Sequence, residues 1–141
     1  MQEAGGVEAP LVLLVDDYED TRQMMRHMLE TLGCRVLEAA NGQEAIALSQ
    51  ADPPDLVLMD LNMPVLDGFN ATLRIHEYEA TSDVPVVALT AYDTTEFRAA
   101  ASAVGCCDYV VKPLDLERLA ALLECLLPSR PSTRTAKTGS Q

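Results

Sequence analysis

Short apolar runs without polar interruptions recur five times along the chain. They cover residues 11–15, 36–37, 56–59, 84–89 and 109–111. Continuous runs, unlike alternating ones, are typical of strands that are buried on both faces of a sheet. Each run is followed by a stretch in which apolar residues recur at helical spacing, such as Met25, Leu29 and Leu32 after the first run. The pattern therefore predicts five successive strand–helix units.

Glycine or proline closes several of the predicted helices. Gly33 follows the first helix, Gly105 closes a helix expected from about Thr94 to Val104, and Pro128 ends the last helix. Glycine is common just after a helix C-cap, and proline cannot continue a helix. Strands that alternate with helices favour a parallel sheet covered on both faces, because parallel neighbours need a crossover connection. The sequence thus predicts an α/β fold.

Four of the five apolar runs end in a reactive polar side chain. These side chains are Asp16 with Asp17, then Asp60, Thr90 and Lys112. Ligands of an open parallel sheet bind outside the carboxyl ends of its strands, so we expect all five to meet in one crevice. Three carboxylates together attract a cation, and a few hard oxygen ligands suit Mg²⁺. A carboxylate beside Mg²⁺ and a lysine is also suited to accept a phosphoryl group.

Each of these residues also has an ordinary structural interpretation. A single aspartate after a strand is commonly a helix N-cap or a solvated loop residue. Thr90 alone is explained as a turn hydroxyl, and Lys112 alone as a surface charge. The pattern by itself leaves a phosphate or metal site and these structural roles open as alternatives.

The charge balance limits the classes of partner. The chain has 141 residues, with 22 acidic and 10 basic side chains and a net charge of −12. All the acidic residues precede Pro128, and the first 127 residues carry a net charge of −15. An acidic surface repels a phosphate backbone, so we expect no direct nucleic-acid binding. It favours a metal cation or a basic protein surface instead.

The ends of the chain differ from its centre. We expect a flexible N-terminus over residues 1–9, one folded domain over residues 10–127, and a disordered tail or truncated linker over residues 128–141. No apolar stretch approaches the length of a membrane span, and the first ten residues lack the features of a secretion signal. The four cysteines show no metal-binding spacing, which favours reduced thiols and a cytoplasmic location.

Several blocks of residues together resemble the receiver domain of bacterial two-component response regulators, over about residues 10–127. The resemblance rests on Leu13-Leu14-Val15-Asp16-Asp17, Val57-Leu58-Met59-Asp60-Leu61-Asn62-Met63-Pro64, Leu66-Asp67-Gly68, Leu89-Thr90-Ala91 and Asp108-Tyr109-Val110-Val111-Lys112-Pro113. The blocks occur in the order and approximate spacing of that family. The resemblance implies a flavodoxin-like, doubly wound, five-stranded parallel sheet in the order 2-1-3-4-5 with five helices, in a three-layer sandwich.

The resemblance also implies a role for each site residue. Asp60 is the expected phosphoacceptor. The expected Mg²⁺ ligands are the carboxylates of Asp17 and Asp60, the backbone carbonyl of Asn62, and Asp16 directly or through water. Lys112 is expected to pair with the acceptor or its phosphoryl group, through a cis peptide bond to Pro113. Thr90 is expected to follow the phosphoryl group, Ala91 to leave room beside it, and Tyr109 to swing inward.

The function that follows is a signalling switch. The resemblance implies that a histidine kinase, a histidine phosphotransfer protein or a small phosphodonor supplies the phosphoryl group, and that the domain catalyses only its own phosphorylation and dephosphorylation. The surface made by the fourth helix, the fifth strand and the fifth helix is then expected to bind a downstream protein. Ala121 and Leu122 take the place of a basic residue used in DNA-bound dimers, which favours a different partner protein and a monomer or weak dimer.

Two other functions use similar residues. A phosphatase or phosphotransferase acting on a free metabolite needs a substrate cap and a second acid two residues after the nucleophile, whereas Leu61 and Asn62 follow Asp60. A degenerate receiver used only for docking does not need the intact acidic, threonine and lysine set.

Overall fold

The computed structural model describes residues 9–63 and 67–127, which fold around one sheet. Its strands are β1 (Leu11–Val15), β2 (Arg35–Ala39), β3 (Leu56–Asp60), β4 (Val86–Thr90) and β5 (Asp108–Val111). All neighbouring strands are parallel, in the order β2-β1-β3-β4-β5. The expected flavodoxin-like topology is therefore confirmed.

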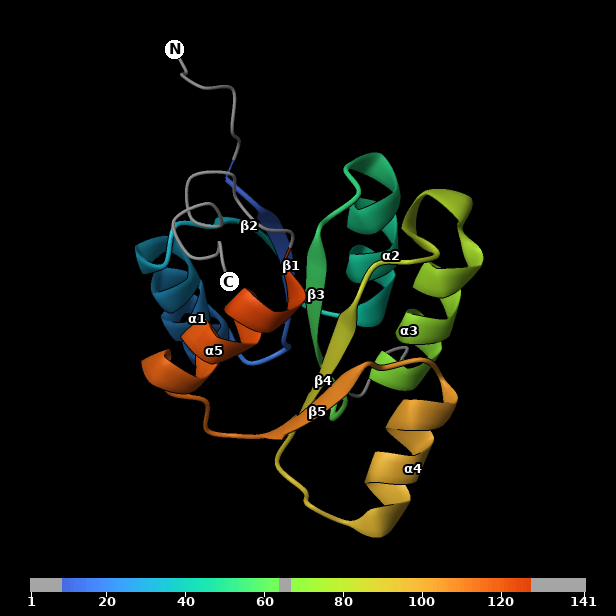
Figure 1. Cartoon of the computed structure of the whole chain (residues 1–141). Coiled ribbons are helices and arrows are strands. Elements are labelled where there is room, and N and C mark those ends of the chain that lie inside the picture. The colour runs from blue at the N-terminus through green and yellow to red at the C-terminus, as the bar shows by residue number, and fades with distance from the viewer. Residues whose placement is uncertain (1–8, 64–66, 128–141) are drawn as a thin grey trace, which may run out of the picture.

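Helices cover both faces of this sheet. They are α1 (Glu19–Thr31), α2 (Gly42–Ala51), α3 (Gly68–Glu77), α4 (Thr95–Ala103) and α5 (Leu116–Leu126). Figure 1 shows α1 and α5 on one side of the sheet, with α2, α3 and α4 on the other. The three-layer arrangement agrees with the predicted crossover connections.

The side chains of the continuous apolar strands pack into two separate hydrophobic cores. Val12 and Leu14 of β1 join a cluster with Met25 of α1 and Leu119 of α5. Leu13 and Val15, which point to the other face of the same strand, join a second cluster with side chains of α2, α3 and α4. Successive residues of one strand face opposite sides, so a strand between two helical layers is apolar on both faces up to its carboxyl end.

Several boundaries differ from the predicted ones. β2 extends from Arg35 to Ala39 although only two of its residues form an apolar run, because it is an edge strand with mostly half-buried side chains. A short 3₁₀ helix, η2 (Glu79–Thr81), follows α3 and was not predicted. Leu73, one of the apolar positions expected in the third helix, is 43% exposed.

The predicted helix stops are confirmed by backbone conformation. Gly33 follows α1 with φ of +92°, and Gly105 follows α4 with φ of +104°. Both values lie in the left-handed region that glycine adopts without steric cost.

Some sequence expectations lie wholly or largely outside the described residues. These are the flexible N-terminus over residues 1–9, the tail over residues 128–141, and Pro64 and Leu66 of the family-like blocks. Within the described part of the chain, the helices are too short and too polar to cross a membrane. None of the four cysteines, all of which lie among the described residues, forms a disulfide.

Candidate functional site

Three carboxylates meet at the carboxyl ends of the two central strands. Asp16 and Asp17 follow β1, and Asp60 is the last residue of β3. One carboxylate oxygen from each lies within 4.8 Å of the others. Asp16 and Asp60 are buried and Asp17 is exposed, so the cluster opens to solvent on one side. The predicted convergence of these acids is therefore observed.

Lys112 reaches the acidic cluster from the end of β5. Its Nζ lies 3.3 Å from Asp16 Oδ2 and 3.4 Å from Asp60 Oδ2. The Lys112–Pro113 peptide bond is cis, as the family resemblance implied. The backbone N–H of Lys112 donates to the carbonyl of Thr90 over 2.8 Å, which fixes the start of this turn against β4. The ammonium thus pairs with the two buried carboxylates of the cluster.

The environment of Asp60 disfavours its charged form. Burial raises the pKa of Asp60, and the Asp16 carboxylate adds to the rise, whereas the Asn62 N–H and the Lys112 ammonium reduce it. A buried carboxylate that is only partly compensated attracts a further cation. The hard oxygen donors of this cluster are the ligand type that Mg²⁺ prefers. The residues present therefore fit a divalent metal.

Glycine at the start of α3 lets this helix pack directly under the acceptor strand. A Cβ atom at Gly68 would lie 2.6 Å from the backbone oxygen of Asp60. Asp67 caps the same helix, since its Oδ1 accepts from the N–H of Asn70 over 2.9 Å. The Asp67-Gly68 pair thus starts α3 at the place where only a bare backbone fits.

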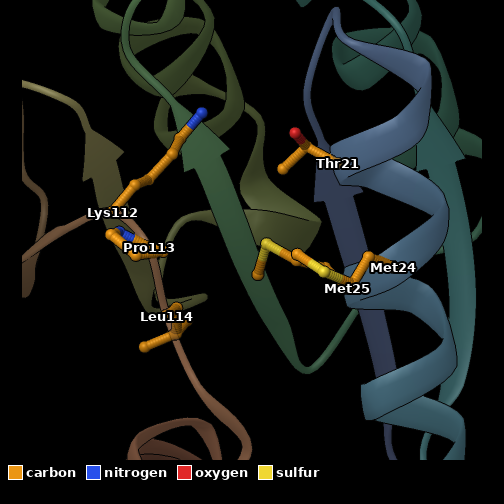
Figure 2. A pocket seen from close by; sticks show the side chains of 6 residues that line it. All are labelled: Thr21, Met24, Met25, Lys112, Pro113 and Leu114. Atoms are coloured by element: carbon orange, nitrogen blue, oxygen red, sulfur yellow. The ribbon is translucent and has the colours of Figure 1, made fainter.

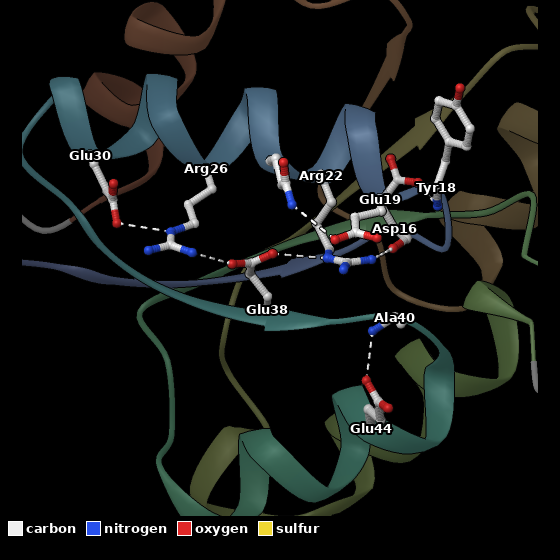
Figure 3. A network of polar contacts seen from close by, with 10 residues as sticks. Asp16, Tyr18, Glu19, Arg22, Arg26, Glu30, Glu38, Ala40 and Glu44 are labelled. Carbon is white, nitrogen blue, oxygen red and sulfur yellow. Dashed lines mark hydrogen bonds and ion pairs between the residues drawn. The ribbon is translucent and has the colours of Figure 1, made fainter.

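A polar network behind Asp16 holds the first acidic loop. Asp16 Oδ1 accepts from the N–H of Tyr18 over 2.9 Å, and its backbone carbonyl accepts from Arg22 over 2.8 Å. Arg22 and Arg26 both pair with Glu38 of β2 (Figure 3). Burial acts to raise the pKa of Glu38, but hydrogen bonds from the two arginines outweigh it and hold that pKa below its ordinary value. No pattern in the sequence indicated this link between α1 and β2.

The side chain of Asn62 makes contacts that were not predicted. Its backbone N–H donates to Asp60 Oδ1 over 2.9 Å. Its side-chain Oδ1 accepts from the Thr90 hydroxyl and from the Ala91 N–H, both over 3.1 Å. Asn62 was expected to contribute only its backbone carbonyl, as a metal ligand. The carboxamide instead joins the loop after β3 to the end of β4.

The connection continues from Thr90 to Tyr109. Thr90 Oγ1 accepts from the N–H of Tyr92 over 3.1 Å, and the Tyr109 hydroxyl donates to the carbonyl of Tyr92. The Arg98 guanidinium lies 4.5 Å from the centre of the Tyr109 ring and also pairs with Asp93 over 2.9 Å. Thr90 and Tyr109 are therefore linked through the backbone of Tyr92, beside Arg98.

A mostly apolar pocket of about 260 Å³ adjoins Lys112. Figure 2 shows Met24 and Met25 of α1 on one side, and Pro113 and Leu114 of the turn after β5 on the other. Met24 is 53% exposed. The pocket thus places apolar surface beside Lys112, whose ammonium pairs with Asp16 and Asp60.

The chain is similar to known proteins over most of its length. The family model described as response regulator receiver domain matches residues 12–124. The transcriptional regulatory protein PrrA of Mycobacterium tuberculosis is 37% identical over 133 residues, which is 94% of this chain and 56% of PrrA. The protein PilH of Pseudomonas aeruginosa is 37% identical over 116 residues, which is 82% of this chain and 96% of PilH. The chain thus spans about half of PrrA and nearly all of PilH.

A solved structure is similar in both fold and sequence. It is the receiver domain of the sensor histidine kinase PA1611 from Pseudomonas aeruginosa, with a magnesium ion coordinated in its active-site cleft. The TM-score is 0.80 at 34% identity, and the match covers 86% of this chain and 99% of that one.

Proposed function

This chain belongs to the response regulator receiver domain family, and we propose that its phosphoacceptor is Asp60. The domain is a phosphoacceptor of two-component signalling, as its relatives are. The observation that carries the assignment to Asp60 is its place in the cluster. It is the buried acid at the end of the central strand, beside two further acids and 3.4 Å from Lys112.

The chemistry that we propose is transfer between two nucleophiles. A carboxylate oxygen of Asp60 attacks the phosphorus of a phosphohistidine, the new P–O bond forms, and the P–N bond breaks with its electron pair left on the imidazole. Lys112 offsets negative charge on the transferring oxygens, and the Thr90 hydroxyl donates to one of them. Hydrolysis of the acyl phosphate later returns Asp60 to its free form. The domain thus acts on itself rather than as a conventional enzyme.

Mg²⁺ is the proposed cofactor of this step. The carboxylates of Asp16, Asp17 and Asp60 and the backbone carbonyl of Asn62 would hold it. When bound, the metal neutralises charge on the transferring phosphoryl group. The support is the group of three acids within 4.8 Å of one another and the hard oxygen character of the donors.

The phosphodonor that we propose is a histidine kinase or a histidine phosphotransfer protein. The pocket between α1 and the turn after β5 offers Met24, Met25 and Leu114 to an apolar side chain of that donor (Figure 2). Burial of one such side chain contributes about 1.5–3 kcal/mol. Docking there would hold the donor beside Lys112 and the acidic cluster.

The output surface that we propose is the one made by α4, β5 and α5. Tyr109 lies on it and is linked through Tyr92 to Thr90. Its exposed acids include Asp93, Glu96 and Glu117, which favours a basic surface on the downstream protein. Ala121 is exposed on α5 and Leu122 is buried in the core, so neither offers a cation to a second copy of this surface, and the expected partner is a different protein.

Labelling with acetyl phosphate and Mg²⁺ tests the acceptor. The wild type should gain one acid-stable, base-labile phosphate, detected by mass spectrometry, and Asp60→Asn should gain none. Asp83→Asn is the matched control, because it removes an exposed acid just before β4, away from the cluster. Equal labelling of the wild type and Asp60→Asn would overturn the assignment.

A further inference from the structure

Two hydrogen-bond donors at the end of β4 converge on one oxygen atom. The Thr90 hydroxyl and the Ala91 N–H each lie 3.1 Å from Oδ1 of Asn62. Thr90 is fully buried, and its Oγ1 already accepts from the N–H of Tyr92. A hydroxyl has a single proton to donate, so that of Thr90 is committed to Asn62.

The same asparagine is held beside the acceptor. Its backbone N–H donates to Asp60 Oδ1 over 2.9 Å, and Asp60 pairs with Leu89 in the register between β3 and β4. Thr90 and Ala91 follow Leu89 directly, so their donors lie at the same edge of the sheet as the Asp60 carboxylate. An anionic group attached to Asp60 would need such donors.

We propose that the carboxamide oxygen of Asn62 is a placeholder for a phosphoryl oxygen. In the unphosphorylated protein it takes the Thr90 hydroxyl and the Ala91 N–H, and it must release both before they turn to the phosphoryl group. This inference rests on the proposed phosphorylation of Asp60. Asn62 is a positioning residue in this role, because it acts through Thr90.

The placeholder sets how easily the switch operates. The Thr90 hydroxyl oxygen also accepts from the N–H of Tyr92, and the carbonyl of Tyr92 accepts from the Tyr109 hydroxyl. When Thr90 moves away from Asn62, these hydrogen bonds to Tyr109 on the output surface change as well. The hydrogen bonds to Asn62 favour the unphosphorylated arrangement. The factor by which they favour it is the factor by which they weaken the binding of a phosphoryl group or its mimic at Asp60. Asn62 is exposed, so water replaces its oxygen when the side chain is removed, and only the net strength of the hydrogen bonds counts.

The experiment measures binding of beryllium fluoride, an acyl phosphate mimic, at saturating Mg²⁺. The chain has no Trp, so the Ala91 amide resonance in a ¹⁵N NMR titration is the readout. Asn62→Ala keeps the backbone carbonyl but loses the placeholder, and it should bind the mimic about fivefold more tightly. Asn62→Ser, whose hydroxyl is too short to replace the carboxamide, should shift in the same direction.

Two further variants serve as controls, and the alanine and serine variants separate this role from a merely structural one. Asn62→Asp retains an acceptor oxygen and adds a negative charge, so it should bind the anionic mimic more weakly than the wild type. Asn70→Ala, the same loss on the exposed side of α3, should leave the affinity unchanged. A structural role predicts weaker binding in the alanine, serine and aspartate variants alike.

The outcomes distinguish this inference from the proposed function. If the wild type does not bind the mimic, or if Asp60→Asn binds it equally well, the assignment of Asp60 fails and the placeholder fails with it. If the wild type binds at Asp60 but neither Asn62→Ala nor Asn62→Ser binds more tightly, only the placeholder is overturned.

Discussion

Replacing Asp60 by asparagine should stabilise the metal-free protein at neutral pH, although it abolishes phosphorylation. The substitution keeps the shape of the side chain and an oxygen that can accept from the Asn62 N–H. It removes one negative charge from a partly buried cluster of three carboxylates and one ammonium. The expected gain comes from leaving one charge fewer buried and from the relief of repulsion within that cluster.

The distances set the size of this gain. Two unit charges 4.8 Å apart, the limit within which these carboxylate oxygens lie, repel by about 3.5 kcal/mol at an effective dielectric constant of about 20. Asp60 meets two such repulsions, and Lys112 at 3.4 Å offsets about 5 kcal/mol of them. The balance is a repulsion of about 2 kcal/mol, which solvent around the exposed Asp17 reduces. We therefore expect a gain of about 1–2 kcal/mol and a rise in Tm of roughly 5 °C.

The pH dependence provides a second test with a definite sign. Burial raises the pKa of Asp60 in the folded protein above its value in the unfolded chain. The folded state therefore holds this proton more tightly, and the wild type loses stability as the pH rises through the folded value. Asparagine does not titrate, so the advantage of Asp60→Asn should be largest at pH 7 and should shrink as the pH falls toward the ordinary pKa of an aspartate.

Thermal unfolding followed by circular dichroism, in EDTA and in Mg²⁺, measures both effects. Asp83→Asn controls for the loss of one negative charge from the whole molecule. Mg²⁺ should narrow the difference, because a cation that binds only the folded state stabilises the wild type by mass action and the variant has lost a ligand. An equal or lower Tm for Asp60→Asn in EDTA, or an advantage that does not shrink as the pH falls, would refute the reasoning.

Three further predictions test the metal, the helix start and the output surface. Asp16→Asn and Asp17→Asn should each weaken Mg²⁺ binding and slow both phosphorylation and dephosphorylation, and undiminished affinity in both by calorimetric titration would contradict the site. Gly68→Ala should cost about 1–3 kcal/mol in urea unfolding, because its Cβ would lie 2.6 Å from a backbone oxygen of β3 that cannot turn away. A phosphate mimic should move NMR resonances between Thr90 and Leu119, and shifts confined to the loops around Asp60 would exclude the relay.

The fold was predictable wherever burial alone selects the residue type. β1, β3 and β4 are buried at every position, and a strand covered on both faces has no polar residue to interrupt its apolar run. β2 was predicted too short because its open edge tolerates Arg35 and Glu38 among half-buried residues. The 3₁₀ helix over Glu79–Thr81 was not predicted, because a single turn has no period that a sequence pattern can reveal.

The site was predictable only in its topological part. Parallel strands bring their carboxyl ends to one edge, so Asp16, Asp60 and Lys112 had to meet once the strand order was known. The carboxamide of Asn62, the carbonyl of Tyr92 and the guanidinium of Arg98 lie on loops or on a neighbouring helix. Their contacts depend on the direction of each side chain in space, which neither spacing nor hydrophobic pattern encodes.

The net charge of the site connects the repulsion among its carboxylates with its proposed role as a phosphoacceptor. Three carboxylates and one ammonium leave a formal charge of −2, which a divalent cation balances. Converting a carboxylate into an acyl phosphate adds further negative charge, and that excess has no additional cation among the residues that form the site. Neutral donors must therefore stabilise it, and the buried Thr90 hydroxyl and the Ala91 N–H are donors at the same sheet edge. Because Asn62 holds both of them, the charge added at Asp60 and the release of Thr90 toward the output surface become one event.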